Sequence, residues 1–306
     1  MPGLKEMRIQ HGDATLVGTL HLPDGDGPLP AIIMLQGSGA TNRDAEGYFL
    51  PIRETFLGRG VAVLSWDKPG IGASTGDWRT RTLHDRADEA LTAIEWLSEQ
   101  QEIDPARVGI WGHSQGGWVG PLATSQSSKV AFLIINSGPG VGPHEQDFFG
   151  VEHTLRRDGA TEEEIEQALA FMEALHDASN RQLPYAETFA TVLEPARGTR
   201  GATYFGELSE QDWQFFLRNA QHPFDPPPAL ERITCPVLAI FGEHDSLVPV
   251  EQSVEIFKRT LAGNDDVTIR IFSGADHRIQ VGGPLTFAPG YLDLLGDWLQ
   301  QQTQPR

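Results

Sequence analysis

The sequence predicts an α/β protein built on a doubly wound, mostly parallel β-sheet. Short apolar runs without alternation are typical of strands that are buried on both faces of such a sheet. Segments with apolar residues at helical spacing, the clearest of them at 83–97, separate these runs, and strands that alternate with helices favour a parallel arrangement. The apolar runs are 31–36, 61–66, 108–111, 130–136 and 237–241.

The two ends of the predicted sheet have a different character. Runs 5–10 and 15–22 flank the turn His11-Gly12-Asp13 and predict an N-terminal antiparallel hairpin. Run 267–272 alternates between apolar and polar residues, as expected of an edge strand. Further helices are expected around 54–57, 254–261 and 291–299, and the Gln-rich tail from Gln300 is expected to fray.

Residues 141–233 interrupt the alternation of strand and helix. They contain no buried-strand run but hold an acidic helical stretch at 162–178, aromatic clusters and a proline run at 226–228. We expect a helical cap at 141–233, inserted into a core domain made of 1–140 and 234–306. Such a cap would cover the carboxyl ends of the strands, where open α/β sheets bind ligands. A surface excursion without a role in binding is the alternative.

Composition limits the classes of partner. The 306 residues are 39% hydrophobic and carry a net charge of -19, and such an acidic surface disfavours binding to nucleic acids or membrane surfaces. The single cysteine, Cys235, excludes an intrachain disulfide. No apolar stretch approaches the roughly 18 residues of a membrane span, and the N-terminus lacks the apolar region of a signal peptide. We therefore expect a soluble, cytoplasmic protein.

A candidate nucleophile follows the apolar run 108–111. The segment Gly112-His113-Ser114-Gln115-Gly116-Gly117 fits the pattern G-x-S-x-G and precedes a helical stretch. A strand, a sharp turn and a helix form the context of a nucleophile elbow, which raises the serine hydroxyl to the mouth of the sheet. Glycines suit the strained turn. Ser114 is thus the predicted nucleophile, whereas His113 is expected to have a packing role.

A general base and an acid are expected after later strands, in the chain order nucleophile, acid, base. Asp245 follows run 237–241, and His277 follows run 267–272. His277 would accept the Ser114 proton, and Asp245 would orient the imidazole. Glu243 stays open as the acid, although it lies nearer the strand. Asp276 adjoins His277 in sequence and is poorly placed to bind it.

The oxyanion hole requires two backbone N–H donors. One is expected from Gln115, the residue after the nucleophile. The other is expected from Ser38 in the loop Gln36-Gly37-Ser38-Gly39, which follows run 31–36. An ordinary glycine-rich turn is the alternative interpretation of that loop.

Together these motifs resemble the α/β-hydrolase superfamily, and specifically bacterial carboxylesterases near its prolyl-oligopeptidase-like branch. The resemblance rests on the Gln36–Gly39 loop with Asn42-Arg43-Asp44, on 67–74, on 112–117, on Gly242-Glu243-His244-Asp245 and on Asp276-His277. It implies an α/β-hydrolase fold. The family usually has His where Gln36 stands, but the expected donor is a main-chain amide further on. The turn Asp67-Lys68-Pro69-Gly70 resembles a structural turn of the family.

The resemblance implies a serine esterase that cleaves carboxylic esters of small to medium size through an acyl-enzyme on Ser114. The expected partner is a small-molecule ester, and neither a metal nor an organic cofactor is expected. A thioesterase, an amidase or peptidase, or a lactonase could use the same triad and stays open. A non-catalytic ligand-binding relative is less expected, because all three triad residues are present.

Overall fold

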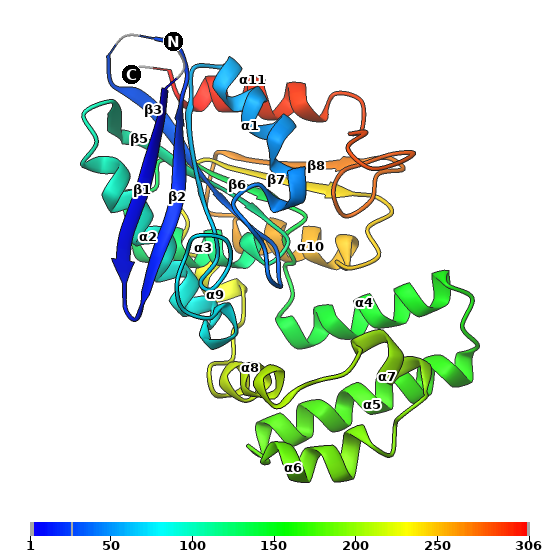
Figure 1. The fold of residues 1–306 in the computed structure, drawn as a ribbon. Coiled ribbons are helices and arrows are strands. Elements are labelled where there is room, and N and C mark those ends of the chain that lie inside the picture. Colours follow the sequence, from blue (N-terminus) through cyan, green and yellow to red (C-terminus); the bar gives the residue numbers. More distant parts are fainter. Residues whose placement is uncertain (1–2, 26, 305–306) are drawn as a thin grey trace.

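The computed structural model describes residues 3–25 and 27–304, and an eight-stranded sheet lies at its centre (Figure 1). The strand order is β1-β2-β4-β3-β5-β6-β7-β8. The strands are β1 (Gly3–His11), β2 (Ala14–Leu22), β3 (Leu29–Leu35), β4 (Ala62–Trp66), β5 (Ile103–His113), β6 (Leu133–Asn136), β7 (Val237–Gly242) and β8 (Val267–Phe272).

The strand directions confirm the predicted doubly wound sheet. Strands β3 to β8 run parallel to one another. Strand β2 pairs antiparallel with β1, through the predicted hairpin, and with β4. Each of the apolar runs became one of the strands β3 to β7, and the alternating run became β8 at the sheet edge. Because the strands from β3 onward are parallel, the loops that follow β3, β5, β7 and β8 all leave from one edge of the sheet.

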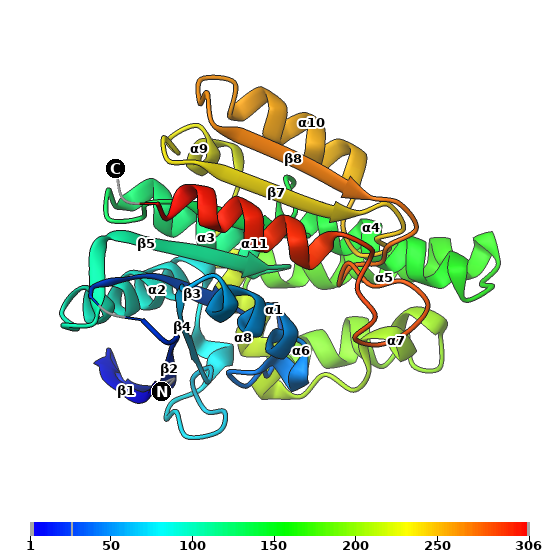
Figure 2. The same cartoon turned by 90° about the horizontal axis from the view of Figure 1, so that it is seen from above.

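Helices cover both faces of the sheet (Figures 1 and 2). One face packs against α2 (Leu83–Ser98), α3 (Gly116–Gln126) and α10 (Val250–Thr260), and their apolar side chains join the larger core cluster. The other face packs against α1 (Phe49–Gly58) and α11 (Tyr291–Gln302) in a second cluster. Two covered faces explain why the central strands consist almost entirely of apolar residues.

The C-terminal tail differs from the expectation. Helix α11 continues to Gln302 where fraying was expected from Gln300. The Thr303 hydroxyl donates to the Leu299 carbonyl at 2.9 Å, and the Thr303 carbonyl accepts from Arg107 Nη1 at 2.9 Å. These bonds anchor the last turn to the start of β5, so the described part of the tail is ordered.

The segment after β6 is helical and carries two apolar clusters of its own, apart from the clusters of the sheet. One cluster joins α4 to α5, and the other joins α5 to α8 around Trp213. Helices α4, α5 and α8 of this segment stand apart from the sheet and its covering helices in Figure 1. The helices of the segment are α4 (Pro143–Arg157), α5 (Glu162–Asn180), α6 (Tyr185–Thr188), α7 (Arg200–Phe205), α8 (Glu210–Gln221) and α9 (Pro227–Leu230).

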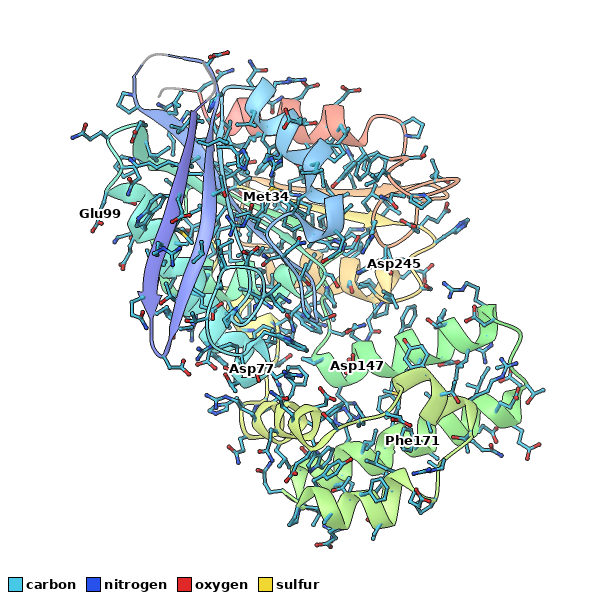
Figure 3. All side chains as sticks on the ribbon, viewed as in Figure 1. Met34, Asp77, Glu99, Asp147, Phe171 and Asp245 are labelled. Carbon is cyan, nitrogen blue, oxygen red and sulfur yellow. The ribbon has the colours of Figure 1, made fainter. Side chains whose placement is uncertain are left out.

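This helical segment contacts the core on its α4 side and on its α8 side, and α9 packs into the larger core cluster of the sheet. On the α4 side, Trp118 Nε1 of α3 donates to the Val141 carbonyl at 2.9 Å, and Gln146 Nε2 donates to the Leu247 carbonyl at 2.8 Å. On the α8 side, Gln211 Nε2 donates to Asp77 Oδ2 at 2.6 Å. In Figure 3 the labelled Asp245 lies in the core, whereas Asp147 and Phe171 lie in α4 and α5.

None of the helices in the described residues is both long and apolar enough to cross a membrane.

Candidate active site

Ser114 occupies the sharp junction between β5 and α3. Its φ is 54°, a left-handed conformation that costs energy in a non-glycine residue and persists only where the surroundings hold it. The Ser114 amide donates to the Asn136 carbonyl at 3.0 Å, and the Ser114 carbonyl accepts from the Gly117 amide at 2.7 Å. Ser114 is partly exposed.

The glycines around Ser114 are required by close backbone contacts. A Cβ atom at Gly112 would lie 2.1 Å from the Gly116 carbonyl oxygen. A Cβ atom at Gly116 would lie 2.5 Å from the Leu35 carbonyl oxygen. Any larger residue would push α3 away from β5 or β3, and this explains the G-x-S-x-G pattern in physical terms.

His277 and Asp245 meet across the loops that follow β8 and β7. His277 Nδ1 lies 2.8 Å from Asp245 Oδ2, and the other carboxylate oxygen accepts from the amides of Leu247 at 2.8 Å and Val248 at 3.0 Å. The Asp245 side chain is 0% exposed and that of His277 is 14% exposed. Because an ionised carboxylate only accepts, Nδ1 carries the proton and Nε2 is left as the basic nitrogen.

The two alternative acids have other partners. Glu243 Oε2 accepts from the Ser273 hydroxyl at 2.6 Å and from the Gly274 amide at 2.8 Å, and these bonds lower the pKa of Glu243. Asp276 Oδ1 accepts from the amides of Arg278 and Gln280, both at 2.9 Å, and so closes a turn. In the described structure, neither carboxylate bonds to His277.

His113 is buried beside the His277 ring, with 4.9 Å between the ring centroids. Its Nδ1 lies 3.2 Å from Asn136 Nδ2, which is a donor, so Nδ1 accepts. Burial, with further contributions from His277 and Arg278, holds the pKa of His113 well below its usual value. A neutral His113 therefore packs against the candidate base, in keeping with its expected packing role.

A buried polar network links the Ser114 turn to the His277 loop, and sequence reasoning missed it. Tyr291 donates to Asn136 Oδ1 at 2.8 Å, Asn136 Nδ2 donates to the Tyr48 hydroxyl at 3.2 Å, and Tyr48 donates to the Arg278 carbonyl at 3.2 Å. The Asn136 main chain also holds the Ser114 amide. The only hint in the sequence was the polar Asn136 at the end of an apolar run.

The loop after β3 lies directly against Ser114. A Cβ atom at Gly37 would lie 3.3 Å from Ser114 Cβ and 3.7 Å from Ser114 Oγ. Among residues 3–25 and 27–304, the amides of Ser38 and Gln115 have no protein acceptor. Each of the two segments contacts Ser114 or adjoins it in the chain, and N–H groups without a protein acceptor are what a developing oxyanion requires. Gln36 is buried, and its Nε2 donates to the Trp66 carbonyl.

The Asp67-Lys68-Pro69-Gly70 turn contacts this loop, a connection that the sequence did not reveal. Asp67 Oδ2 pairs with Arg43 Nη2 at 2.6 Å and accepts from the Ala73 amide at 3.1 Å, which fits the expected structural turn. Lys68 is fully buried, and its Nζ donates to the carbonyls of Gly37 and Gly39, the latter at 2.7 Å. A charged residue directly after an apolar run was the available signal.

A groove of about 810 Å³ lies between α4 and the loop after β7. Its walls include Phe149 and His153 of α4, and Asp245 borders it, whereas Ser114 and His277 do not. The groove therefore adjoins the candidate site without containing its reacting centre. No cluster of three or more His, Cys, Asp or Glu side chains that could hold a metal ion occurs in the part of the chain described.

Two curated relatives are similar to this chain in sequence. Esterase EstD of Thermotoga maritima is 26% identical over 86% of this chain and 57% of its own length. Esterase FrsA of Escherichia coli O157:H7 is 30% identical over 56% of this chain and 38% of its own length. The chain thus spans about half the length, or less, of these curated relatives.

The Pyrococcus furiosus esterase Pf2001 superposes with a TM-score of 0.66 at 20% identity, covering 99% of this chain and 92% of that one. This likeness confirms the predicted α/β-hydrolase fold. Residues 12–275 match the family described as X-Pro dipeptidyl-peptidase (S15 family). Because that match spans most of the 306 residues, the chain belongs to the S15 family of α/β hydrolases.

Proposed function

We propose that the protein is a serine hydrolase that cleaves carboxylic esters of small to medium size. The observation that carries the proposal is the 2.8 Å bond between His277 and Asp245, at the sheet edge where Ser114 is held at positive φ. The choice of an ester is supported by the relatives, since EstD, FrsA and Pf2001 are all named as esterases.

The proposed reaction proceeds through an acyl-enzyme. His277 Nε2 takes the Ser114 proton as Oγ attacks the ester carbonyl, and Asp245 stabilises the imidazolium that forms. The amides of Ser38 and Gln115 bind the oxyanion of the tetrahedral intermediate. His277 then protonates the departing alkoxide. Water, deprotonated by the same nitrogen, attacks the acyl-enzyme and releases the acid and Ser114.

We further propose that α4 to α8 act as a cap over the reacting centre. Support comes from their position after β6, from their separate apolar clusters, and from contacts with the core on two sides. A covered, finite pocket favours short and medium acyl chains over long-chain lipids. The cytoplasmic location stays a prediction of the sequence.

Peptide cleavage is the second candidate, because the family match carries the description X-Pro dipeptidyl-peptidase. The same triad can attack an amide, and the two activities differ in the leaving group that His277 must protonate.

A substrate panel tests the proposal. We expect p-nitrophenyl esters with short and medium acyl chains to be hydrolysed with a higher kcat/KM than an X-Pro p-nitroanilide or an emulsified long-chain triglyceride. Ser114→Ala should abolish all of these activities. Preferential cleavage of the X-Pro anilide would replace the esterase proposal with the peptidase, and faster turnover of the emulsion would contradict the covered pocket.

A further inference from the structure

Lys68 is a buried amine whose hydrogen bonds go only to main-chain carbonyls. Its Nζ donates to the carbonyls of Gly37 and Gly39, and among the described residues no carboxylate lies within ion-pair distance of it. Burial, with a further contribution from Arg86, holds the pKa of Lys68 well below its usual value. Burial of an amine costs free energy of folding unless its N–H groups find acceptors, and for Lys68 both acceptors belong to the loop beside Ser114.

These two carbonyls flank Ser38, the expected oxyanion donor. In a trans peptide unit the C=O and N–H groups point in opposite directions. The Gly37 carbonyl and the Ser38 amide belong to the same peptide unit, so a bond from Lys68 to that carbonyl turns the Ser38 N–H away from Lys68. Gly37 itself lies against the Ser114 side chain.

The loop has little else to keep that peptide unit in place. Ser38 stands between two glycines, and Gly39 has a φ of 79°, so the backbone here can rotate at low cost. Thr41 Oγ1 reaches the carbonyls of Ser38 and Gly39 only at 3.4 and 3.3 Å, long for bonds made by a hydroxyl. Lys68 Nζ lies 2.7 Å from the Gly39 carbonyl oxygen, closer than Thr41 Oγ1 lies to either carbonyl.

Gln115, the other expected oxyanion donor, also contacts a buried basic side chain. Arg86 of α2 is buried, and its Nη1 donates to Gln115 Oε1 at 2.8 Å. The acid nearby is Glu89, whose pKa is raised to about 6, chiefly by burial. Lys68 and Arg86 thus each hydrogen-bond to one of the two segments that carry the expected donors, and donor groups that are fixed before the reaction favour a developing oxyanion.

We infer that Lys68 is a positioning residue of the reaction, which holds the Ser38 N–H toward the oxyanion by fixing the carbonyls on either side of it. The inference rests on the proposed acyl-transfer function. It concerns orientation, because among the described residues Lys68 Nζ hydrogen-bonds to the carbonyls of Gly37 and Gly39 and not to the Ser114 hydroxyl. Without this amine, the peptide unit between Gly37 and Ser38 would be free to flip.

The test compares Lys68→Met with a matched control, Arg107→Met. Arg107 also binds two carbonyls, those of Pro28 at 2.8 Å and Thr303 at 2.9 Å, but it does so at the opposite end of the strands. Each purified variant is assayed with p-nitrophenyl butyrate for kcat and KM. Each is also titrated with an alkyl trifluoromethyl ketone, whose serine adduct carries an oxyanion.

In Lys68→Met we expect kcat to fall by about 100-fold, the size of effect seen when a donor is misplaced. KM should change little, and the inhibition constant of the ketone should rise by the same factor as kcat/KM falls. Arg107→Met should keep wild-type values of all three. If Lys68 only stabilised the fold, its replacement would not change the ketone inhibition constant and kcat/KM by the same factor.

A Lys68→Met variant with wild-type kcat and ketone affinity would overturn the inference and leave the esterase proposal intact. A wild-type protein that cleaves neither esters nor amides would instead refute the proposed function. If Lys68→Met does not fold, Lys68→Gln carries the test, because its amide can donate to one of the two carbonyls. It should then show a smaller but parallel loss of turnover and ketone affinity, and an unchanged Lys68→Gln would contradict the inference.

Discussion

At the scale of single residues, the site depends on how three side chains are restrained. Ser114 is kept at a φ of 54° by the close packing of Gly112 and Gly116. Asp245 is fully buried, and its carboxylate accepts two main-chain amides in addition to His277 Nδ1. These three hydrogen bonds fix the Asp245 carboxylate in place, and a fixed acceptor suits the task of orienting an imidazole.

Asp245→Asn tests the orientation role directly. The asparagine keeps the shape of the side chain but can present an N–H to His277 Nδ1, which favours the wrong tautomer. We expect kcat for ester hydrolysis to fall by about 10⁴-fold, with the fold retained by circular dichroism.

Glu243→Gln is the matched control, because its carboxylate hydrogen-bonds to Ser273 and Gly274, lies 4.0 Å from His244 Nε2, and has no bond to His277 among the described residues. Its turnover should stay close to that of the wild type. If Glu243→Gln lost activity while Asp245→Asn kept it, the assignment of the acid would be wrong.

The sequence predicts the candidate triad but not the residues around it. The prediction of Ser114, Asp245 and His277 rests on an apolar run and a local motif at each of them. Asn136 and Tyr291, in contrast, lie 155 positions apart and meet only because α11 packs across β6. Lys68 was visible in the sequence, but its contact with Gly37 depends on how two loops fold toward each other.

At the scale of elements, apolar periodicity was a sufficient guide to the strands. Because parallel strands are buried on both faces, each appears in the sequence as an unbroken apolar run, and these runs predicted β3 to β7. The alternation of apolar and polar residues predicted β8 at the edge of the sheet. Helix α11 was underestimated because its last turn is glutamine-rich. That turn is held by the bond between Arg107 and Thr303, which lie 196 positions apart and give no local signal.

The inserted helices should form a separate folding element. Trp213 of α8 is fully buried in the cluster with Phe171 and Leu175 of α5, and its Nε1 donates to the Leu183 carbonyl at 2.8 Å. We expect Trp213→Ala to destabilise α5 to α8 by about 3–5 kcal/mol. In hydrogen exchange, the amides of these helices should lose protection while those of β3 to β7 keep theirs.

Trp298→Ala provides the matched control. Trp298 of α11 packs on Phe132 beneath the sheet, with 6.2 Å between the rings. Its loss should lower protection in the sheet strands. Equal loss of protection throughout the chain in both variants would contradict a separable insertion.

At the scale of the whole molecule, one sheet edge collects the parts of the proposed site. The loops after β3, β5, β7 and β8 supply Ser38, Ser114, Asp245 and His277 in turn, because a parallel sheet presents all its carboxyl ends on one side. The substrate could not be predicted in the same way. It depends on how α4 to α8 lie over that edge, and such packing between distant elements has no local signature in the sequence.

The central claim is that Ser114 is an activated nucleophile. The most direct measurement is labelling with a fluorophosphonate, read by intact mass and peptide mapping, on the wild type and on Ser114→Ala. We expect a single adduct on the peptide that contains Ser114, and none on the variant. A folded wild-type protein that takes up no label, or takes it up on another serine, would contradict this account of the site.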